Sequence, residues 1–391
     1  MSVRSSGRSF PVPRNTPDRS SRIVLLAGVA AAAAMTTSTA LAQSITNIGV
    51  PAGGTSSGAS AVNGNGSAVA ANVNMESAHR WTTSGFTNLG LLPGAVSASA
   101  EDISHDGSAI VGSQFIATPE ETIRAYRWTT GGGLQNLGTL PGGVASIGNG
   151  ISGDGTVATG ASFDMDFNPT AFRWTSAGGM QSLGTVPGGT SSEGRRVSQN
   201  GSAIIGVAGT PSGDRAFRWT EAGGTQNLGL FSPSDSGSSA FGVSADGTVV
   251  AGFSGTNAVI WTNGVPQSLG TLPGADSAIA YAVGADGSLI GGYSFFGQSP
   301  SASLWSPSLG LVDLNTYLPT LGIDLTGWEL QYTRDISFDG TTLVGEGRFN
   351  GAFRGWVVTI PSPSAAAVLG LGGLLVSRRR KSTRVSSPPR P

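Results

Sequence analysis

Short segments in which apolar and polar residues alternate recur along most of the chain. Residues 216–220 (Ala-Phe-Arg-Trp-Thr) place Phe and Trp on one face and Ala, Arg and Thr on the other, the period of two that is typical of a β-strand. Asp246-Gly247 separates two further segments of this kind, and we expect a two-residue type I′ hairpin there, with positive φ at both residues. The pattern predicts short antiparallel strands joined by tight turns.

Three markers recur in a fixed order, seven times each, and show that the strands belong to a repeated unit. An Asx-Gly pair precedes an apolar run, a tryptophan ends an alternating segment, and a Leu-Gly type turn follows. The pairs begin at Asn65, Asp106, Asp154, Asn200, Asp246, Asp286 and Asp339; the tryptophans are Trp81, Trp128, Trp174, Trp219, Trp261, Trp305 and Trp356; the turns begin at Ile48, Leu89, Leu137, Leu183, Leu228, Leu269 and Leu311. Successive tryptophans are 42–51 residues apart, the length of a four-stranded propeller blade.

We therefore predict an all-β fold, a seven-bladed β-propeller of four-stranded antiparallel blades over residues 43–360. The first repeat begins with a fourth-strand segment at residues 45–49, and the last ends after a third strand at residues 352–360. The N-terminal strand is thus expected to complete the last blade and close the ring. A linear β-solenoid or a paired sandwich is the alternative, although a solenoid gives no reason for this offset of one strand.

The composition fits a folded, acidic body. The 391 residues include 61 glycines and no cysteine, while a hydrophobic content of 38% and evenly spaced tryptophans argue against disorder. Residues 43–376 hold eleven arginines, no lysine and twenty-two acidic residues, a formal charge of −11. Binding to nucleic acid or to an anionic membrane is not expected, because phosphate contacts need clustered Lys and Arg.

Residues 1–42 have the order of a secretory signal peptide. Five arginines and one acid precede an apolar run at residues 23–34. Ala40 and Ala42 supply the small residues that a signal peptidase reads, which predicts cleavage before Gln43 and an exported protein. The alternative is a short buried helix.

Several of the repeated motifs resemble the extracellular HAF-repeat family, named for a His-Ala-Phe tripeptide ahead of Arg-Trp. The likeness covers about residues 45–360 and is carried by the Asp-Gly turns, by Ala-Phe-Arg-Trp-Thr at 171–175 and 216–220, by Leu-Gly-Thr-Leu-Pro-Gly-Gly at 137–143 and by Gly-Trp-Glu-Leu at 327–330. Thr170 or Arg215 stands where the naming histidine would be. The resemblance implies the fold and export, and it implies no ligand.

Residues 361–391 resemble a PEP-CTERM sorting signal of bacterial surface proteins. Its parts are Pro361, Ser362 and Pro363, with Ser362 in place of the usual glutamate, an apolar run at residues 365–376, and the basic residues Arg378, Arg379, Arg380 and Lys381. The resemblance implies an exosortase-like sorting protease as a partner. Twelve apolar residues fall short of the roughly 20 that span a bilayer, so we expect transient membrane insertion with the basic flank in the cytoplasm. A tail anchor that stays in place is the alternative.

Few residues suggest catalysis. His79 occupies the Phe position of a third strand and is expected to pack, whereas His105 precedes a turn and is expected to face solvent. Glu193 and Glu329 are isolated in the sequence, so no carboxylate pair for glycosidase chemistry stands out. We therefore predict no catalytic residue and no cofactor.

Three other features have both a binding and a structural interpretation. Asp164, Asp166 and Asn168 form a weak candidate calcium site, since they alternate oxygen ligands but lack the glycine and distal glutamate of an EF-hand loop. Trp328 is either a core residue or a platform for a sugar. The arginines before the first four tryptophans either stack on rings or pair with acids between blades, or else form a ligand-binding ring; they are Arg80, Arg127, Arg173 and Arg218.

The sequence thus predicts an exported, non-catalytic protein of the cell surface or extracellular matrix, whose propeller loops bind a polysaccharide or a surface protein. One alternative is a propeller hydrolase or lyase that acts on glycans. The other is a calcium-dependent adhesin. Because propellers host many unrelated activities, the fold by itself does not decide among these functions.

Overall fold

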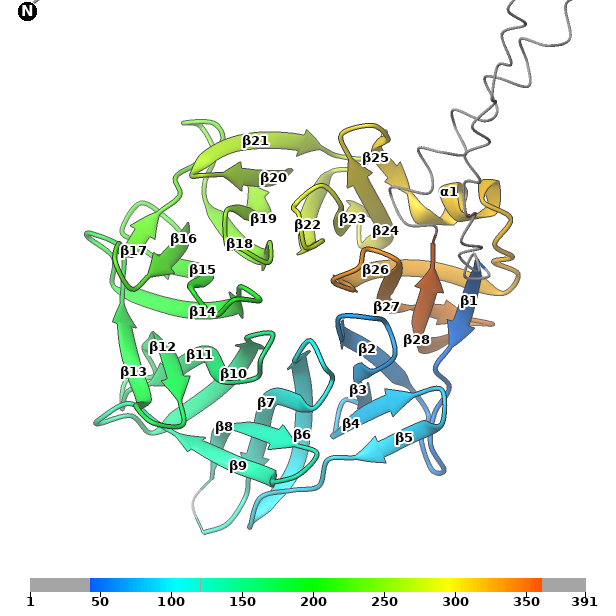
Figure 1. Ribbon diagram of the computed structural model, residues 1–391. Coiled ribbons are helices and arrows are strands. Elements are labelled where there is room, and N and C mark those ends of the chain that lie inside the picture. Colours follow the sequence, from blue (N-terminus) through cyan, green and yellow to red (C-terminus); the bar gives the residue numbers. More distant parts are fainter. Residues whose placement is uncertain (1–42, 120, 361–391) are drawn as a thin grey trace, which may run out of the picture. The chain divides into compact units, whose positions relative to one another are not determined.

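The computed structural model describes residues 43–119 and 121–360, which form a ring of seven four-stranded antiparallel sheets around a central channel (Figure 1). This confirms the predicted seven-bladed propeller and excludes the solenoid and the paired sandwich. The predicted signal peptide with Ala40 and Ala42 lies outside the described residues, as does the predicted tail with Pro361, Ser362, Pro363 and the basic cluster. Within the described ranges, no helix is long and apolar enough to cross a membrane.

Blades 1 to 6 each contain four consecutive strands, and the first strand of each blade lines the channel (Figure 1). Blade 1 contains β2 (Ser57–Val62), β3 (Val69–Val73), β4 (Ser77–Thr82) and β5 (Gly85–Asn88); blade 2 contains β6 (Ala95–Ile103), β7 (Ala109–Ile116), β8 (Thr122–Thr129) and β9 (Gly133–Gly138); blade 3 contains β10 (Ala145–Ile151), β11 (Val157–Phe163), β12 (Pro169–Thr175) and β13 (Gly179–Gly184); blade 4 contains β14 (Ser191–Val197), β15 (Ala203–Gly209), β16 (Arg215–Thr220) and β17 (Gly224–Asn227).

The remaining blades follow the same plan, with the order changed in the last one. Blade 5 contains β18 (Ser238–Val243), β19 (Val249–Ser254), β20 (Asn257–Thr262) and β21 (Val265–Gly270); blade 6 contains β22 (Ser277–Val283), β23 (Ile290–Phe296), β24 (Ser299–Ser306) and β25 (Gly310–Asp313); blade 7 contains β26 (Trp328–Ile336), β27 (Thr342–Phe349), β28 (Ala352–Thr359) and β1 (Ser44–Asn47).

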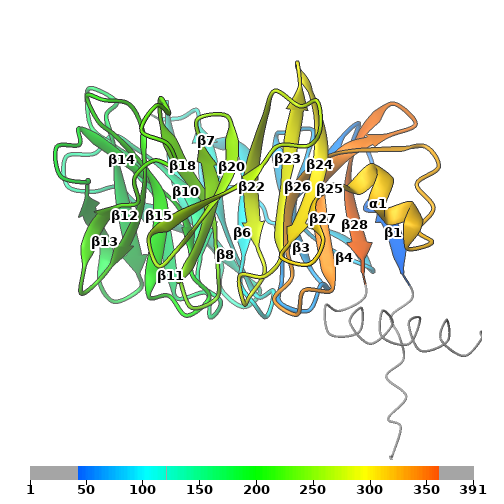
Figure 2. The ribbon, with the colours of Figure 1, turned by 90° about the horizontal axis from the view of Figure 1, so that it is seen from above.

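Blade 7 is completed by the N-terminal strand, as predicted. β1 pairs antiparallel with β28, with Ser44 opposite Thr359 and Thr46 opposite Val357. The ring therefore has no open sheet edge at this point. Both ends of the described chain lie on the face that carries the Asx-Gly turns, since Ile360 N donates to Thr341 O (2.8 Å) next to one such turn (Figure 2).

The Asx-Gly turns are not the two-residue type I′ hairpins that we predicted. Gly107 has positive φ (73°), but Asp106 does not. Gly107 N donates to Ser104 O (2.9 Å) and Ser104 N donates to Ala109 O (2.9 Å), which closes a loop of four residues. The Asp106 carboxylate accepts bonds from the Ser104 hydroxyl (2.7 Å) and from Ser108 N (2.9 Å). The aspartate is therefore favoured by local hydrogen bonds, and the glycine alone by the left-handed conformation.

Backbone hydrogen bonds also join the turns of neighbouring blades. Gly64 N donates to His105 O (2.8 Å), His105 N donates to Gly153 O (2.8 Å), and Gly153 N donates to Gln199 O (2.9 Å). These bonds hold blades 1 to 4 together where the channel is lined by the turns.

Close contact between strands explains much of the glycine content. A Cβ on Gly160 in β11 would lie 1.9 Å from Ile147 O in β10 and 3.0 Å from the Phe172 ring in β12, so no side chain fits. Glycines at the equivalent position of five other blades face the same obstruction: Gly112, Gly206, Gly252, Gly292 and Gly345. In blades 2, 3, 4 and 7 an aromatic residue of the third strand thus packs directly on this glycine, and in all six blades the missing side chain lets the first two strands lie close together.

The longest spacing between tryptophans contains a helix that the sequence pattern did not predict. α1 (Leu314–Thr320) is capped by Asp313, whose carboxylate accepts a bond from Asn315 N (2.8 Å). Leu314 and Leu318 are buried in a cluster with core residues of blades 6 and 7. Trp328 packs against the same cluster, so the structure supports its core interpretation.

Candidate functional site

A β-bulge in the first strand of every blade determines which side chains face the channel. Each register shift leaves one extra, unpaired residue on the inner strand. The bulge residues are Ser60, Glu101, Asn149, Arg195, Phe241, Tyr281 and Arg334. Each lies five positions before the Asx of its turn. The propeller thus presents seven different side chains from one repeated backbone position.

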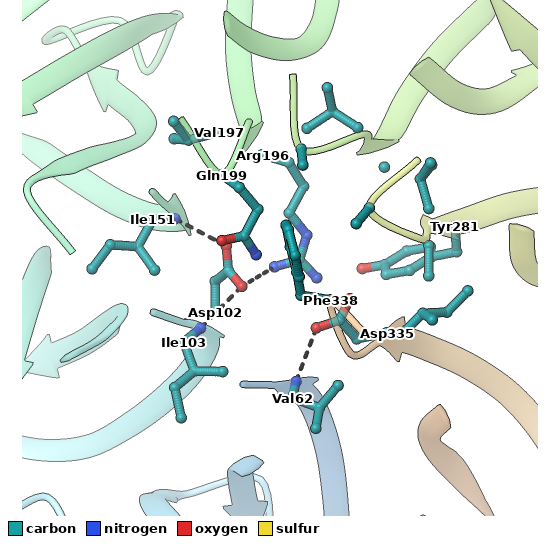
Figure 3. Close-up of a pocket in the computed structure, with 17 residues that line it drawn as sticks. Val62, Asp102, Ile103, Ile151, Arg196, Val197, Gln199, Tyr281, Asp335 and Phe338 are labelled. Carbon is teal, nitrogen blue, oxygen red and sulfur yellow. Dashed lines mark hydrogen bonds and ion pairs between the residues drawn. The ribbon is translucent and has the colours of Figure 1, made fainter. Parts of the chain in front are cut away.

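The position after each bulge brings two carboxylates and an arginine together near the turn face (Figure 3). Arg196 Nη1 lies 3.0 Å from Asp102 Oδ1, and the Asp335 carboxylate lies on the other side of the guanidinium. Ile151 N of blade 3 donates to Asp102 Oδ2 (2.9 Å), and Val62 N of blade 1 donates to Asp335 Oδ2 (2.9 Å). Each carboxylate therefore links its own blade to the next one.

The environment of this triad shifts the pKa of all three groups. Burial raises the pKa of Asp335 to about 6; Arg196 opposes this shift and Asp102 adds to it. Burial also raises the pKa of Asp102, against the effect of Arg196 and of its backbone donors. Although burial opposes the charge of Arg196, the two carboxylates raise its pKa above the ordinary value. Two buried carboxylates, Asp102 and Asp335, thus share one buried cation, Arg196. This arrangement favours protonation of one of the two carboxylates.

The space beside the triad is small. The cavity that Asp102, Arg196 and Asp335 line has a volume of about 60 Å³. It has room for a few water molecules, whereas pockets for small molecules measure roughly 300–1,000 Å³. The triad therefore has a structural role, which is to connect neighbouring blades.

Aromatic side chains pack against one another beside the triad, in blades 5 to 7. Phe241 and Tyr281 stack with their ring centroids 5.2 Å apart, and Tyr293 meets the Tyr332 ring edge-on at 4.9 Å. Arg195 lies over Phe241, with its guanidinium carbon 4.2 Å from the ring centroid. A hollow of about 120 Å³ here is also lined by Glu101, Asn149 and Glu193. One wall of the channel is thus aromatic and the other is polar.

A larger cavity of about 510 Å³ opens on the face opposite the Asx-Gly turns, over blades 7, 1 and 2 and the β23–β24 hairpin. We call it the mouth cavity. Its charged residues are Arg334, Glu346 and Arg348, its aromatic residues are Tyr332 and Phe353, and its other lining residues are Ser56, Ser57, Gly58, Asn72, Met75, Ser99, Gln298, Pro300 and Gln331. The volume is within the range of pockets that hold small molecules, and the lining combines rings, amides and hydroxyls.

Arg334 and Glu346 form the fixed part of this cavity. Arg334 Nε and Nη2 lie 2.8 Å and 2.7 Å from Glu346 Oε2. The guanidinium carbon of Arg334 is also 4.6 Å from the Tyr332 ring centroid and 5.2 Å from that of Tyr281. Despite burial, the Glu346 carboxylate raises the pKa of Arg334, so this guanidinium stays charged.

The histidines lie where the repeat pattern predicted. His79 is buried in β4, with its ring edge-on to Phe86 at a centroid distance of 5.6 Å. Burial lowers its pKa, against a backbone hydrogen bond at Ser77. His105 is exposed, although its ring also meets Phe338 edge-on at 4.8 Å. Neither histidine lines the mouth cavity.

Asp164, Asp166 and Asn168 lie together in the exposed loop between β11 and β12. The Asp164 carboxylate accepts hydrogen bonds from Asp166 N (2.9 Å), Asn168 N (2.9 Å) and the Asn168 amide (3.2 Å). The loop thus uses this carboxylate for its own backbone. Within the described ranges, no group of three or more His, Cys, Asp and Glu residues is placed to hold a metal ion. The calcium site stays a prediction.

Three of the recurring arginines form hydrogen bonds to the neighbouring blade. Nε of Arg80 donates to Gly107 O (2.8 Å), that of Arg127 to Gly155 O (2.7 Å), and that of Arg218 to Gly247 O (2.6 Å). Each acceptor is the glycine of the Asx-Gly turn in the following blade. The structural interpretation is thus supported for these three residues, with a backbone carbonyl as partner in place of an acid or a ring.

The two isolated glutamates separate in space. Glu193 lies in the channel, where the Asn149 amide donates to its Oε1 (3.1 Å) and Glu101 lines the same hollow. Glu329 is exposed at the start of β26. The sequence pattern missed Glu101, Asp102, Arg196, Asp335 and the residues of the mouth cavity. For the channel residues a signal existed, namely two adjacent positions, five and four residues before every Asx-Gly pair, whose chemistry varies from blade to blade.

Comparison with known proteins gives structural similarity alone. No family model and no curated protein matches the chain in sequence. Among solved structures, oligogalacturonate lyase from Vibrio parahaemolyticus is similar with a TM-score of 0.54 and 11% identity, over 81% of this chain and 93% of that one. An oligogalacturonate lyase in complex with manganese gives 0.55 and 12% over the same shares.

TolB from Acinetobacter baumannii gives a TM-score of 0.44 and 15% identity; the similarity covers 66% of this chain and 65% of the length of that TolB. At such identities the lyases show that the fold is shared, and they show nothing about activity. The protein is thus a seven-bladed β-propeller whose described residues form a mouth cavity of about 510 Å³ with aromatic, polar and charged lining residues.

Proposed function

We propose that this protein is an exported, non-catalytic surface protein that binds an extracellular polysaccharide in the mouth cavity. The observation that carries the proposal is the mouth cavity itself, about 510 Å³ in volume, in which two aromatic rings and several amide and hydroxyl groups face one space. A sugar ring offers apolar C–H faces to aromatic rings and hydroxyl groups to amides. The volume is within the range of pockets that hold a small ligand.

Export and sorting are part of the same proposal, and they rest on the signal-like residues 1–42 and the tail-like residues 361–391. We propose signal peptidase and an exosortase-like protease as processing partners, and membership in the HAF-repeat family. Ser44 and Thr359 lie on the turn face, opposite the mouth cavity. A protein held at a surface through its C-terminal tail would therefore present this cavity outward.

The rival function is a hydrolase or lyase that acts on glycans, and the shared fold of the oligogalacturonate lyases is what favours it. Glycosidase chemistry needs two carboxylates on either side of a sugar ring. Asp102 and Asp335 face one space, but its volume of about 60 Å³ is too small for a sugar. The mouth cavity has one lining carboxylate, Glu346, which is neutralised by Arg334. Binding without hydrolysis fits these residues better, and product analysis tests the lyase.

The test is binding of the purified protein to a glycan array, with and without calcium, followed by product analysis of every glycan that binds. We expect binding that does not change with calcium, and intact glycans after incubation. Cleaved products would establish the enzyme instead, and strict dependence on calcium would favour an adhesin. If no glycan on the array binds, the proposed polysaccharide-binding function is wrong.

Two variants, Gln331→Ala and Phe353→Ala, test whether the glycan binds in the mouth cavity. Both residues line the mouth cavity, and both substitutions should weaken glycan binding. Phe231→Ala removes an exposed phenylalanine between blades 4 and 5 and serves as the control. Equal loss of binding in all three variants would contradict the location.

A further inference from the structure

The charges on the wall of the mouth cavity do not cancel. Arg334 and Glu346 neutralise each other at 2.7 Å. Arg348 is the remaining charged residue of the lining, and no carboxylate of the described chain lies within 4.0 Å of its guanidinium. The cavity therefore carries one net positive charge, although residues 43–376 have a formal charge of −11.

Arg348 lines the cavity, and among the described residues its guanidinium donates one hydrogen bond. Its Nη1 donates to Gly351 O (3.1 Å) in the hairpin between β27 and β28. Glu329 is opposite Arg348 in the strand register, yet its carboxylate accepts a bond from the Gln331 amide (3.4 Å). The side chain is exposed, so a ligand can reach the other N–H groups of the guanidinium.

We infer that the mouth cavity selects an anionic sugar unit, one that carries a carboxylate or a sulfate ester, and that Arg348 is the residue that recognises the anion. The inference rests on the proposed polysaccharide function and names its ligand class. A guanidinium donates two parallel N–H bonds to either anion, which a neutral hydroxyl cannot accept in the same way. An amino sugar would bring a like charge to Arg348 and is disfavoured.

The acidic body does not prevent this selection. At physiological ionic strength the charges of exposed groups are screened over about 8 Å, so most acids of the ring act weakly on a ligand inside the cavity. A direct charge-assisted bond acts at less than half that distance and in a partly dry site. The direct bond to Arg348 should therefore affect binding more than the overall negative charge of residues 43–376. That overall charge should mainly slow the association of an anionic polysaccharide with the protein.

The experiment compares three hexasaccharides by isothermal titration with the intact protein: a hexuronate, the same hexamer with its carboxylates reduced to alcohols, and a sulfated neutral hexamer. We expect the hexuronate, the sulfated hexamer or both to bind at least about 10-fold more tightly than the reduced hexamer. Arg348→Gln should lower that preference by about 10- to 100-fold, the value of one charge-assisted bond. Arg215→Gln should preserve it, since that arginine lies on the same face of blade 4 and bonds its own loop.

The outcomes separate the two claims. Equal binding of charged and reduced hexamers to the natural protein, or a preference that survives Arg348→Gln, overturns the inference and leaves polysaccharide binding in place. Binding of none of the hexamers, together with a silent glycan array, overturns the proposed function and the inference with it. Tighter binding of the uronate than of the sulfated hexamer, or the reverse, identifies which anion the guanidinium recognises. Unchanged thermal unfolding of Arg348→Gln confirms that its fold is intact.

Discussion

Asp335 shows how one buried side chain links the chemistry of the channel to the stability of the ring. Its pKa is raised to about 6 from the ordinary 3.8, so the folded state holds a proton that the unfolded chain releases between these values. Stability from this group is thus present at low pH and is lost as the pH rises through about 6. Asp335→Asn keeps an acceptor for Val62 N without the charge, and should be more stable at pH 7 by up to about 3 kcal/mol.

The measurement is the free energy of unfolding in urea, for the natural protein and Asp335→Asn, from pH 4 to pH 7. The advantage of the variant should be small at pH 4 and should grow as the pH rises. Asp106→Asn is the matched control: burial favours the neutral form of Asp106, but hydrogen bonds from Ser108 and Ser104 outweigh it and lower the pKa. A constant difference between the natural protein and Asp335→Asn across this range would contradict the burial argument.

Arg127 gives a second prediction at the scale of one residue. Its Nε donates to Gly155 O of the next blade (2.7 Å), and the guanidinium is partly buried, so a substitution leaves that carbonyl without its partner. Arg127→Ala should lower the free energy of unfolding by about 1–3 kcal/mol. Denaturation in urea measures this, with Arg215→Ala as the control because its bonds stay within one loop. Equal effects of the two substitutions would show that the bond between blades contributes nothing specific.

At the scale of the element, the second strand of each blade depends on a glycine. A Cβ on Gly160 would overlap with Ile147 O, which belongs to the strand that lines the channel. Gly160→Ala should therefore destabilise the protein by about 1–3 kcal/mol through forced separation of β10 and β11. Gly131→Ala, at an open position without positive φ, should change stability little. A thermal unfolding comparison tests this, and similar midpoints for both variants would refute it.

The strands could be predicted from the sequence because every blade repeats the same three markers, and the alternation in segments such as residues 216–220 is unbroken. The bulges could not, because a bulge adds a residue without changing the composition of a strand. Glu101 and Asp102 both face the channel only because the register shifts between Ala100 and Asp102. Simple alternation would have sent one of these two carboxylates to the opposite face of the sheet.

The mouth cavity was harder still to foresee. Its lining comes from four blades, and Arg334, which meets Glu346 across two strands of blade 7, is the extra residue of the bulge between Thr333 and Asp335. Helix α1 was also hard to predict from the sequence. Pro319 lies inside it, and its seven residues are too few to show a helical pattern. Local sequence therefore predicted the repeated scaffold, whereas the site arises from the departures from the repeat.

At the scale of the whole molecule, the number of blades and the closing strand were predictable because the repeat starts and stops one strand out of phase. Closure joins residues that are more than 300 positions apart, so it is the contact with the largest cost in chain entropy. The absence of cysteine makes this contact easy to test, since an introduced pair has no competing thiol in the chain.

Thr46→Cys combined with Val357→Cys should form a disulfide between β1 and β28, because these residues are directly opposite each other and cross-strand neighbours have Cα atoms about 5.5 Å apart. The oxidised variant should unfold at a higher temperature than its reduced form, by an amount that reflects about 2–4 kcal/mol, since the bond limits the unfolded chain and prevents loss of β1 from the ring. Comparing the two redox forms of one variant cancels the cost of replacing the buried Val357. If β1 separates before the blades unfold, the reduced form should also show a lower first transition that oxidation removes. Failure to form the bond under mild oxidation would place β1 away from β28 and contradict the closed ring.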